Sequence, residues 1–299
     1  MRKGGMNPAP TILVTGVNGQ VGFELLRTLQ GLGRVVPCDR STLDLSDLDR
    51  VRAFVRDVKP SLIVNPAAYT AVDQAETDVD AARRLNADVP RVFAEEMARS
   101  GGALVHYSTD YVFDGTKADA YVETDATNPA NVYGATKLDG ERAIAATGCA
   151  HLILRTSWVY GRRGRNFLLT MLKLGAERPA LRIVADQVGA PTWAKTIAAA
   201  TAHIVAQGTA STEADWWTRR AGVYHFTSAG ATSWCGFAEA IFATAMSSHV
   251  PQVVPIASSE YPTPAKRPAN SRLSLDKLTA TFGLQMPDWR DALALCLAE

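Results

Sequence analysis

The sequence predicts an α/β fold in which a doubly wound parallel sheet is followed by a smaller C-terminal α/β domain. Short apolar runs alternate with longer segments of helical period through the first half of the chain, a pattern typical of parallel strands joined by crossover helices. A glycine-rich turn follows the first apolar run directly. The length of 299 residues fits two domains, because a domain averages about 150 residues.

Five apolar runs are the expected strands of the sheet. They are rich in Val, Ile and Leu and do not alternate with polar residues, as expected when both faces of a sheet are covered. Strands and crossover helices in this order predict the doubly wound arrangement. The expected strands are residues 12–14, 35–38, 62–64, 103–107 and 152–154, and the expected helices are 21–30, 46–57, 79–100 and 131–147.

The pattern changes after residue 160, where short strands and loops mix with helices near 166–175 and 194–206. Five prolines between residues 251 and 268 predict a long loop, and loops of that length are commonly functional.

These changes divide the chain into two expected domains, residues 1–160 and mainly residues 161–299. A segment near 194–227 can return to the first domain, because its last residues, 222–227, are strand-like.

The composition excludes several classes of protein. The chain has 31 basic and 30 acidic side chains, so its charge of +1 creates no field that attracts nucleic acid. No apolar run reaches the 18 residues of a membrane helix, and the first ten residues contain no signal-peptide core. The four cysteines lack the spacing of a metal site. We expect a cytoplasmic protein with reduced thiols and no membrane or nucleic-acid partner.

A glycine-rich turn lies between the first expected strand and the first expected helix. Gly16, Gly19 and Gly22 leave room for a pyrophosphate to approach the backbone N–H groups of a helix N-terminus. Asp39 ends the second expected strand about 20 residues later, where its carboxylate can accept from a ribose hydroxyl. The order predicts a dinucleotide-binding Rossmann domain, and the alternative is a plain tight turn.

The residues after the second expected strand bear on the choice of cofactor. Asp39 disfavours a 2′-phosphate and Arg40 attracts one, so we expect use of both NADPH and NADH. Asp44 and Leu45 are expected to flank the adenine, although Asp44 is equally suited to cap a helix.

Tyr133 and Lys137 stand four residues apart in a helical segment opened by Asn131, so both face one side of the helix. A phenol has a pKa near 10, and about 4 kcal/mol are needed to bring that pKa to neutrality. A lysine cation at about 4 Å supplies a comparable energy. The pair is suited to exchange a proton with an alkoxide, although such pairs also occur on solvated helices.

Hydroxyl side chains follow the fourth expected strand at its carboxyl end, where doubly wound sheets bind their ligands. Thr109 is our choice for orienting a carbonyl group and Ser108 is the alternative, because strand alternation does not decide which hydroxyl faces the cleft. Ordinary turn chemistry by Ser, Thr and Asp is the competing explanation.

The glycine loop, Ser-Thr-Asp-Tyr-Val-Phe at 108–113 and Tyr-x-x-x-Lys at 133–137 resemble, in this order, the extended short-chain dehydrogenase/reductases. Further motifs at 65–73, 155–160, 186–192 and 267–272 resemble one branch of that family, the dTDP-4-dehydrorhamnose reductases. The resemblance covers about residues 11 to 290. It implies NADPH- or NADH-dependent reduction of the C4 ketone of dTDP-4-dehydro-L-rhamnose, the last step toward a sugar donor for lipopolysaccharide O-antigen and other cell-surface polysaccharides.

Two other functions remain as alternatives on the same fold: a nucleotide-sugar epimerase or dehydratase, which regenerates its cofactor in each cycle, and a non-enzymatic regulatory subunit. The second should have lost Tyr133 or Lys137, and this chain retains both.

The resemblance also implies a role for each matching residue. Tyr133 is the expected proton donor, Lys137 holds the nicotinamide ribose and favours the tyrosinate, and Thr109 steadies the oxyanion. The expected cofactor-binding residues are Gly16, Gly19, Gln20, Val21, Gly22, Asp39, Arg40, Asp44, Leu45, Ala68, Tyr69, Thr70, Tyr133 and Lys137. The expected substrate-binding residues are Thr109, Asp110, Trp158, Asn166, Arg267 and Arg272.

Three of the substrate assignments have structural alternatives. Trp158 is suited to cover the sugar or the base, or else to fill a core. Arg267 and Arg272 are suited to hold the diphosphate, or else are solvated charges.

Some members of the family dimerise through a metal ion held by carboxylates, but the middle ligand position here is Lys195. Glu24 with Asp288 or Asp291 would then be a poor magnesium site, so we predict no metal and leave a homodimer possible. The five histidines stand singly and are expected to be structural: His106, His151, His203, His225 and His249.

Overall fold

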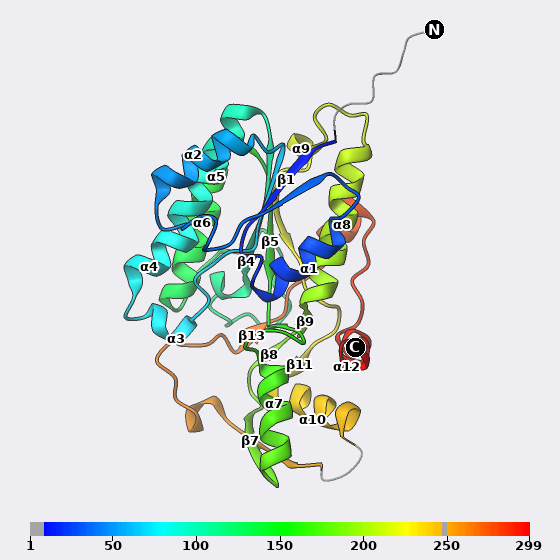
Figure 1. The fold of residues 1–299 in the computed structure, drawn as a ribbon. Coiled ribbons are helices and arrows are strands. Elements are labelled where there is room, and N and C mark those ends of the chain that lie inside the picture. The colour runs from blue at the N-terminus through cyan, green and yellow to red at the C-terminus, as the bar shows by residue number, and fades with distance from the viewer. Residues whose placement is uncertain (1–8, 247–249) are drawn as a thin grey trace.

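The computed structural model describes residues 9–246 and 250–299, so His249 and the first eight residues of the expected first domain lie outside the described residues. Six parallel strands form a central sheet in the order β10-β5-β4-β3-β1-β2 (Figure 1). The predicted doubly wound sheet is confirmed, and β10 is added beside β5. The strands are β1 (Thr11–Val14), β2 (Arg34–Pro37), β3 (Leu62–Asn65), β4 (Ala103–Thr109), β5 (Ala150–Thr156) and β10 (Gly222–His225).

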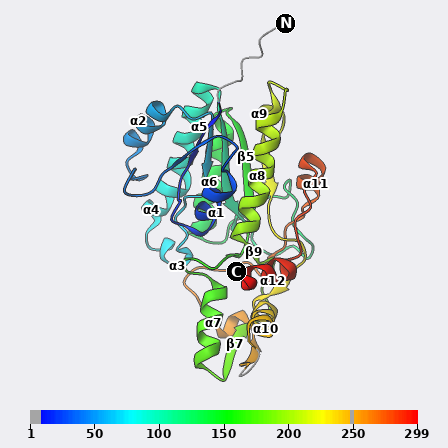
Figure 2. The same ribbon diagram turned by 45° about the vertical axis from the view of Figure 1, so that its right-hand side comes forward.

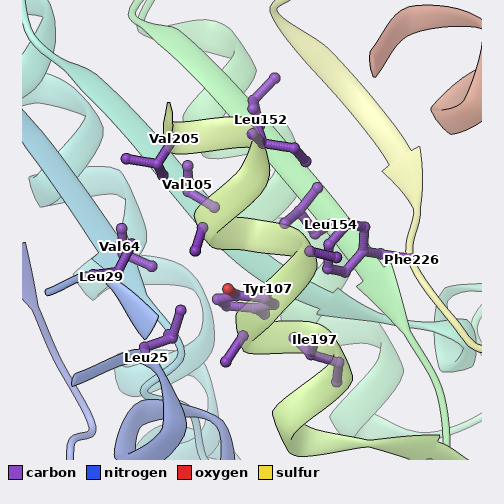
Figure 3. Packing of buried hydrophobic residues seen from close by; sticks show 14 of the residues in the cluster. Leu25, Leu29, Val64, Val105, Tyr107, Leu152, Leu154, Ile197, Val205 and Phe226 are labelled. Carbon is purple, nitrogen blue, oxygen red and sulfur yellow. The ribbon is translucent and has the colours of Figure 1, made fainter. Parts of the chain in front are cut away.

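Two helices, α1 (Gln20–Thr28) and α8 (Ala194–Ala210), cover one face of the sheet. Figure 3 shows Leu25 of α1 and Ile197 of α8 on either side of Tyr107, in one cluster with other apolar side chains of the strands. Each such buried side chain contributes about 1.5 to 3 kcal/mol relative to exposure. The long helix α8 therefore belongs to the sheet, although it follows residue 160 in sequence.

Three further helices, α2 (Leu48–Val58), α5 (Val89–Ser100) and α6 (Val132–Ala146), cover the opposite face (Figure 1). Each strand contributes apolar side chains to the cores on both faces of the sheet, because successive side chains point to opposite faces. Leu13 packs on this face, whereas its neighbours Ile12 and Val14 pack on the other.

The helix expected over 79–100 is divided into α4 (Val79–Arg83), a π-helical turn η1 (Arg84–Asp88) and α5. Pro90 lacks the N–H that would bond the Asn86 carbonyl in a regular helix. Gly140 of α6 packs so closely there that a Cβ would lie 2.1 Å from the same carbonyl oxygen. The π turn thus accommodates the proline and a close helix crossing.

A second, smaller part lies beyond the carboxyl ends of the strands (Figures 1 and 2). Apolar side chains of three helices form its core around Phe237 and Trp289. Its elements are α7 (Phe167–Glu177), β7 (Ala180–Val184), α10 (Trp234–Ala245), β12 (Gln252–Ile256) and α12 (Trp289–Ala298).

The prediction of a continuous loop over 251–268 is wrong at its beginning. Residues Gln252–Ile256 form β12, which pairs in parallel with β7. Pro255 is tolerated within the strand because a two-stranded sheet consists of edges, where a missing N–H costs no ladder bond. The remainder contains only the short 3-10 turn η3 (Ser258–Glu260).

Short elements connect the two parts and complete the fold. They are α3 (Val72–Ala75), η2 (Asp110–Val112), β6 (Val159–Tyr160), β8 (Val188–Gly189), β9 (Thr192–Trp193), α9 (Trp216–Arg219), β11 (Thr232–Ser233), β13 (Asn270–Ser271) and α11 (Asp276–Phe282). Within residues 9–246 and 250–299, no helix has the length and apolar character needed to cross a membrane.

Candidate active site

Most of the predicted site residues follow the carboxyl ends of the parallel strands. Gly16 follows β1, Ala68 follows β3, Thr109 ends β4 and Trp158 follows β5. Since the carboxyl ends of parallel strands meet at one edge of a sheet, the fold gathers these residues where doubly wound proteins bind ligands.

The glycine turn has the geometry of an anion-binding loop. Gly16 has a φ of +57°, and its carbonyl accepts from the Gly19 N–H at 2.9 Å. A Cβ on Gly22 would lie 2.2 Å from that carbonyl oxygen. Helix α1 begins after Gly19 without a side-chain cap, so its first N–H groups remain available to an anion.

Asn166 connects the glycine turn to the second part of the molecule. Its Nδ2 donates to Gln20 Oε1 at 2.8 Å, and its Oδ1 caps α7 by accepting from the Leu169 N–H at 3.1 Å. The side chain expected to bind substrate is therefore committed to contacts within the protein.

Asp39 is held in a defined orientation after β2. Its Oδ1 accepts from the hydroxyls and N–H groups of Ser41 and Thr42, and its Oδ2 accepts from Asn18 at 3.3 Å. The Ser41 hydroxyl is the main cause that lowers the Asp39 pKa to about 2. Arg40 is exposed beside it.

The alternative role of Asp44 as a helix cap is wrong, since its carboxylate accepts from Ser46 and α2 is capped instead by Asp47. Leu45 packs at the margin of the apolar cluster on that face.

The segment after β3 is fixed by Asn86, a residue that the sequence did not indicate. Asn86 Oδ1 accepts from the Tyr69 N–H at 2.8 Å, and its Nδ2 donates to the Tyr69 carbonyl at 3.2 Å and to Thr136 at 3.1 Å. The π turn directs Asn86 toward this segment. Ala68 and Tyr69 are partly buried, and Thr70 is exposed.

Tyr133 lies in the first turn of α6, whose N-cap is Asn131 as predicted. Burial is the main cause that raises the pKa of Tyr133; the Thr109 hydroxyl beside it acts in the opposite direction. This direction differs from the lowered pKa expected from the sequence, because burial disfavours the charged tyrosinate. The phenol ring meets Tyr111 edge-on, with 5.6 Å between ring centroids.

Lys137 is 1% exposed, and its Nζ has two protein partners. It donates to the Tyr107 carbonyl at 2.6 Å and lies 3.0 Å from His106 Nε2. Burial lowers its pKa to about 7, against the opposing charge of Glu141. From the sequence we expected His106 to be structural and assigned it no partner. Its position within an apolar strand could have indicated the contact with Lys137, because a buried polar side chain requires a polar partner.

The two hydroxyls after β4 have different surroundings. Ser108 donates to Glu141, whereas Thr109 donates to Asp110 Oδ1 at 3.0 Å and lies beside the Tyr133 phenol. Burial raises the pKa of Asp110 to about 6, and its Oδ2 has no hydrogen-bond partner among the described residues. Thr109, Asp110 and Tyr133 thus form one cluster of polar side chains at the carboxyl end of β4.

Trp158 is partly exposed and has a left-handed backbone, with a φ of +48°. Its ring stacks on Trp234 with 3.5 Å between centroids. A Cβ on Gly189 would lie 2.8 Å from the Trp158 ring. This strained, supported position differs from that of a core tryptophan and is typical of functional sites.

Arg267 and Arg272 have different surroundings. Arg267 Nη2 donates to Asp73 at 2.8 Å, and its buried Nη1 has no partner among the described residues. Its guanidinium also lies near the Tyr111 hydroxyl. Arg272 donates to Asn270 and to the Ala118 carbonyl, so it holds a loop.

Lys195 forms an ion pair with Glu299, the last residue of the chain, and Glu24 lies near enough to raise its pKa further. Asp288, one of the two carboxylates considered near the C-terminus, caps α12 by accepting from the Arg290 N–H at 2.8 Å. In the described part of the chain, no group of three or more His, Cys, Asp or Glu side chains converges as metal ligands would.

Comparison with known proteins shows the family to which the chain belongs. The model of the RmlD substrate binding domain family matches residues 10–299. The chain belongs to this family. A dTDP-4-dehydrorhamnose reductase of Burkholderia thailandensis is 53% identical over 294 residues, which cover 96% of this chain and 98% of the relative.

Two solved structures agree with the fold and the family. A dTDP-4-dehydrorhamnose reductase of Clostridium acetobutylicum superposes with a TM-score of 0.89 at 36% identity, covering 96% of this chain and 98% of its own. The enzyme of Bacillus anthracis, solved in complex with NADP, has a TM-score of 0.88 at 34% identity and covers 97% of this chain and 99% of its own.

Proposed function

We propose that this protein reduces the C4 ketone of dTDP-4-dehydro-L-rhamnose to dTDP-L-rhamnose with NADPH or NADH. The observation that carries the proposal is the meeting of Tyr133, Thr109 and the glycine turn at one sheet edge, in a chain 53% identical to a dTDP-4-dehydrorhamnose reductase. The product is the sugar donor for lipopolysaccharide O-antigen and related surface polysaccharides.

The residues at the strand edge fit a dinucleotide. The uncapped N-terminus of α1 would receive the pyrophosphate. Glycine at positions 16 and 22 keeps the turn tight, because a Cβ there would lie 3.0 Å from the Ala67 backbone and 2.2 Å from the Gly16 carbonyl oxygen, respectively. Gln20 and Val21 belong to the same turn. Asp39, Arg40, Asp44 and Leu45 would surround the adenosine end, and Ala68, Tyr69 and Thr70 the middle of the cofactor. Bound nicotinamide supplies the hydride that reaches C4.

Tyr133 would give its phenolic proton to the ketone oxygen as that oxygen gains electrons. The raised pKa of Tyr133 supports this role, because a phenol that stays protonated near neutral pH is ready to donate. The Thr109 hydroxyl would hydrogen bond the same oxygen. Lys137 would hold the nicotinamide ribose and then stabilise the tyrosinate left after proton transfer.

The substrate would lie between the sheet edge and the second part of the molecule. Asp110 offers an unpartnered buried oxygen to a sugar hydroxyl, Trp158 offers a flat face, and Arg267 offers an unpartnered Nη1 to a phosphate. Asn166 and Arg272 would act indirectly, by holding the loops that line the site.

We also infer that two parts of the chain bind different ligands. Residues 1–160, joined by 194–227, would bind the cofactor, and most of 161–299 would bind the nucleotide sugar. The protein would work in the cytoplasm as a monomer or a homodimer, and without a metal ion, because Lys195 stands where a carboxylate ligand is expected.

The deciding experiment supplies purified protein with enzymatically made dTDP-4-dehydro-L-rhamnose and follows NADPH absorbance. We expect one NADPH to be consumed for each dTDP-L-rhamnose formed. Conversion of a nucleotide sugar without net loss of NADPH would instead identify an epimerase or dehydratase. Absence of any turnover would favour a regulatory subunit.

A further inference from the structure

Four buried polar side chains form a continuous chain from β1 to α6 beneath the proposed site. Thr15 Oγ1 lies 2.5 Å from the Asn65 amide oxygen, the Asn65 amide nitrogen lies 3.0 Å from His106 Nδ1, and His106 Nε2 lies 3.0 Å from Lys137 Nζ. Thr15, Asn65 and His106 are 0% exposed. Asn65 and His106 are brought together by the register of β3 and β4, in which they are direct partners.

The contacts of Lys137 leave one direction free. An ammonium group has three N–H donors. One is used by the Tyr107 carbonyl and a second points to His106, so a single N–H remains for a ligand. Since Lys137 is almost completely buried, its protein partners fix the Nζ atom, and His106 helps to decide where that third N–H points.

Two arrangements of the His106 proton give the His106–Lys137 hydrogen bond opposite directions. In the first, the Asn65 amide nitrogen donates to Nδ1, His106 carries its proton on Nε2, and Lys137 must be a neutral amine that accepts it. In the second, Lys137 is an ammonium that donates to Nε2. His106 then carries its proton on Nδ1, and the Asn65 amide turns over so that its oxygen accepts. The Asn65 amide occupies the same space in both orientations, because its oxygen and nitrogen are nearly equal in size.

We propose that Thr15, Asn65 and His106 form a positioning relay for Lys137, in which the His106–Lys137 hydrogen bond reverses direction when Lys137 gains or loses its proton. His106 stays neutral in both states, since burial and the Lys137 charge both lower its pKa. The relay keeps Nζ in one place while its charge changes. The inference rests on the proposed function, which gives Lys137 its role beside the cofactor.

Other titratable groups lie on the elements that surround Lys137. On α6 itself these are Tyr133 and Glu141, one turn before and one turn after it; Glu141 is paired with Arg155 of β5. From β4 comes His106, and Asp110 follows that strand near Tyr133. Glu141 is the group whose charge raises the pKa of Lys137. The test must therefore separate a titration of Lys137 from one of its neighbours.

Nitrogen NMR of the full-length protein labelled with ¹⁵N-histidine distinguishes the two His106 tautomers. We expect the Nδ1-protonated form well below pH 7 and the Nε2-protonated form well above it, because the pKa of Lys137 lies at about 7. The missing signal of His106→Gln assigns the resonance. In Lys137→Met one tautomer should persist at every pH. A single tautomer across the range in the unmodified protein, or an imidazolium, would overturn the proposal.

Enzyme kinetics provides a second test with matched variants. His106→Gln keeps an acceptor for Lys137, whereas His106→Leu removes it. We expect His106→Leu to lower kcat about tenfold or more and to raise the KM for NADPH, since hydrogen bonds to charged groups contribute that much. His106→Gln should stay within about threefold of the unmodified enzyme. Equal kcat in His106→Leu, or equal loss in both variants, would contradict the relay.

Val105→Ala is the control for simple loss of packing. Val105 precedes His106 on β4, is fully buried and points into the opposite core. We expect Val105→Ala to lower the melting temperature without lowering kcat. The proposed function fails separately, if the unmodified protein does not oxidise NADPH with the sugar substrate; the NMR experiment still decides the relay in that case.

Discussion

Arg155 and Glu141 form a buried, doubly hydrogen-bonded ion pair between β5 and α6. Arg155 Nε donates to Oε1 at 2.9 Å and Nη2 donates to Oε2 at 2.6 Å, and the two side chains are 4% and 5% exposed. Ser108 donates to the same carboxylate. Because α6 also carries Tyr133 and Lys137, the pair determines how this helix is seated on the sheet.

We predict that Glu141→Gln lowers the free energy of unfolding by about 3 to 5 kcal/mol, because the Arg155 charge then remains buried without its partner. Urea denaturation at neutral pH measures the loss. The double variant Arg155→Met with Glu141→Leu should recover most of it. A single variant within about 1 kcal/mol of the unmodified protein would show that Arg155 finds another partner.

Tyr133→Phe removes the proposed proton donor and little else. We expect kcat to fall about 10² to 10⁴-fold, while the Kd for NADPH changes less than about threefold. Stopped-flow reduction and fluorescence titration measure the two quantities. Tyr224→Phe is the control, because its hydroxyl donates to the Arg220 carbonyl at the far strand β10. Unchanged kcat in Tyr133→Phe would remove the proton-donor assignment.

The free energy of unfolding should fall in mild acid, because the buried His225 imidazole resists protonation in the folded protein. Burial lowers its pKa to about 3, so protons bind more tightly to the unfolded chain than to the folded one. The stabilisation is complete above the unfolded value of about 6.5 and decreases as the pH falls toward about 3. At a pH of about 5 this single group costs about 2 kcal/mol relative to neutral pH.

Between neutral pH and a pH of about 5, the free energy of unfolding of His225→Phe should therefore fall by about 2 kcal/mol less than that of the unmodified protein. A phenyl ring is compatible with the site, where Phe113 already meets the imidazole edge-on at 5.8 Å. Urea denaturation at both pH values provides the comparison. His203→Gln, an exposed position on α8, is the control. Parallel acid losses in all three proteins would show that His225 is not responsible.

Arg40 and Asp39 should determine the choice between the two nicotinamide cofactors. We expect Arg40→Ala to raise the KM for NADPH about tenfold and that for NADH less than about twofold, since a guanidinium recognises a phosphate. Initial-rate kinetics with both cofactors measures the ratio. Asp39→Asn should change the ratio in the other direction, in favour of NADPH. An unchanged ratio in Arg40→Ala would mean that Arg40 does not meet the 2′-phosphate.

The Lys195–Glu299 ion pair predicts independence from divalent metal. Chelator should leave the activity of the unmodified protein intact, and activity lost to chelator but restored by Mg²⁺ would reverse this prediction. Lys195→Glu would place a third carboxylate beside Glu24 and Glu299. We expect Mg²⁺ to raise the melting temperature of that variant and not of the unmodified protein.

Much of the site could be predicted because its signals are local. Three glycines at fixed spacing mark a tight turn, and a spacing of four residues places Tyr133 and Lys137 on one helix face. Some signals misled for an equally local reason. Prolines near 255 suggested a loop, but a strand at the edge of a two-stranded sheet tolerates them.

The sequence alone determined the alternation of strands and helices in the first half of the chain and the glycine turn, since periodicity and backbone sterics act over a few residues. Only the tertiary structure decided that Lys137 meets His106, that Asn166 binds Gln20, and that Lys195 pairs with Glu299. These partners are 31, 146 and 104 residues apart. A buried polar group must find a partner, but which one it finds depends on how distant segments pack.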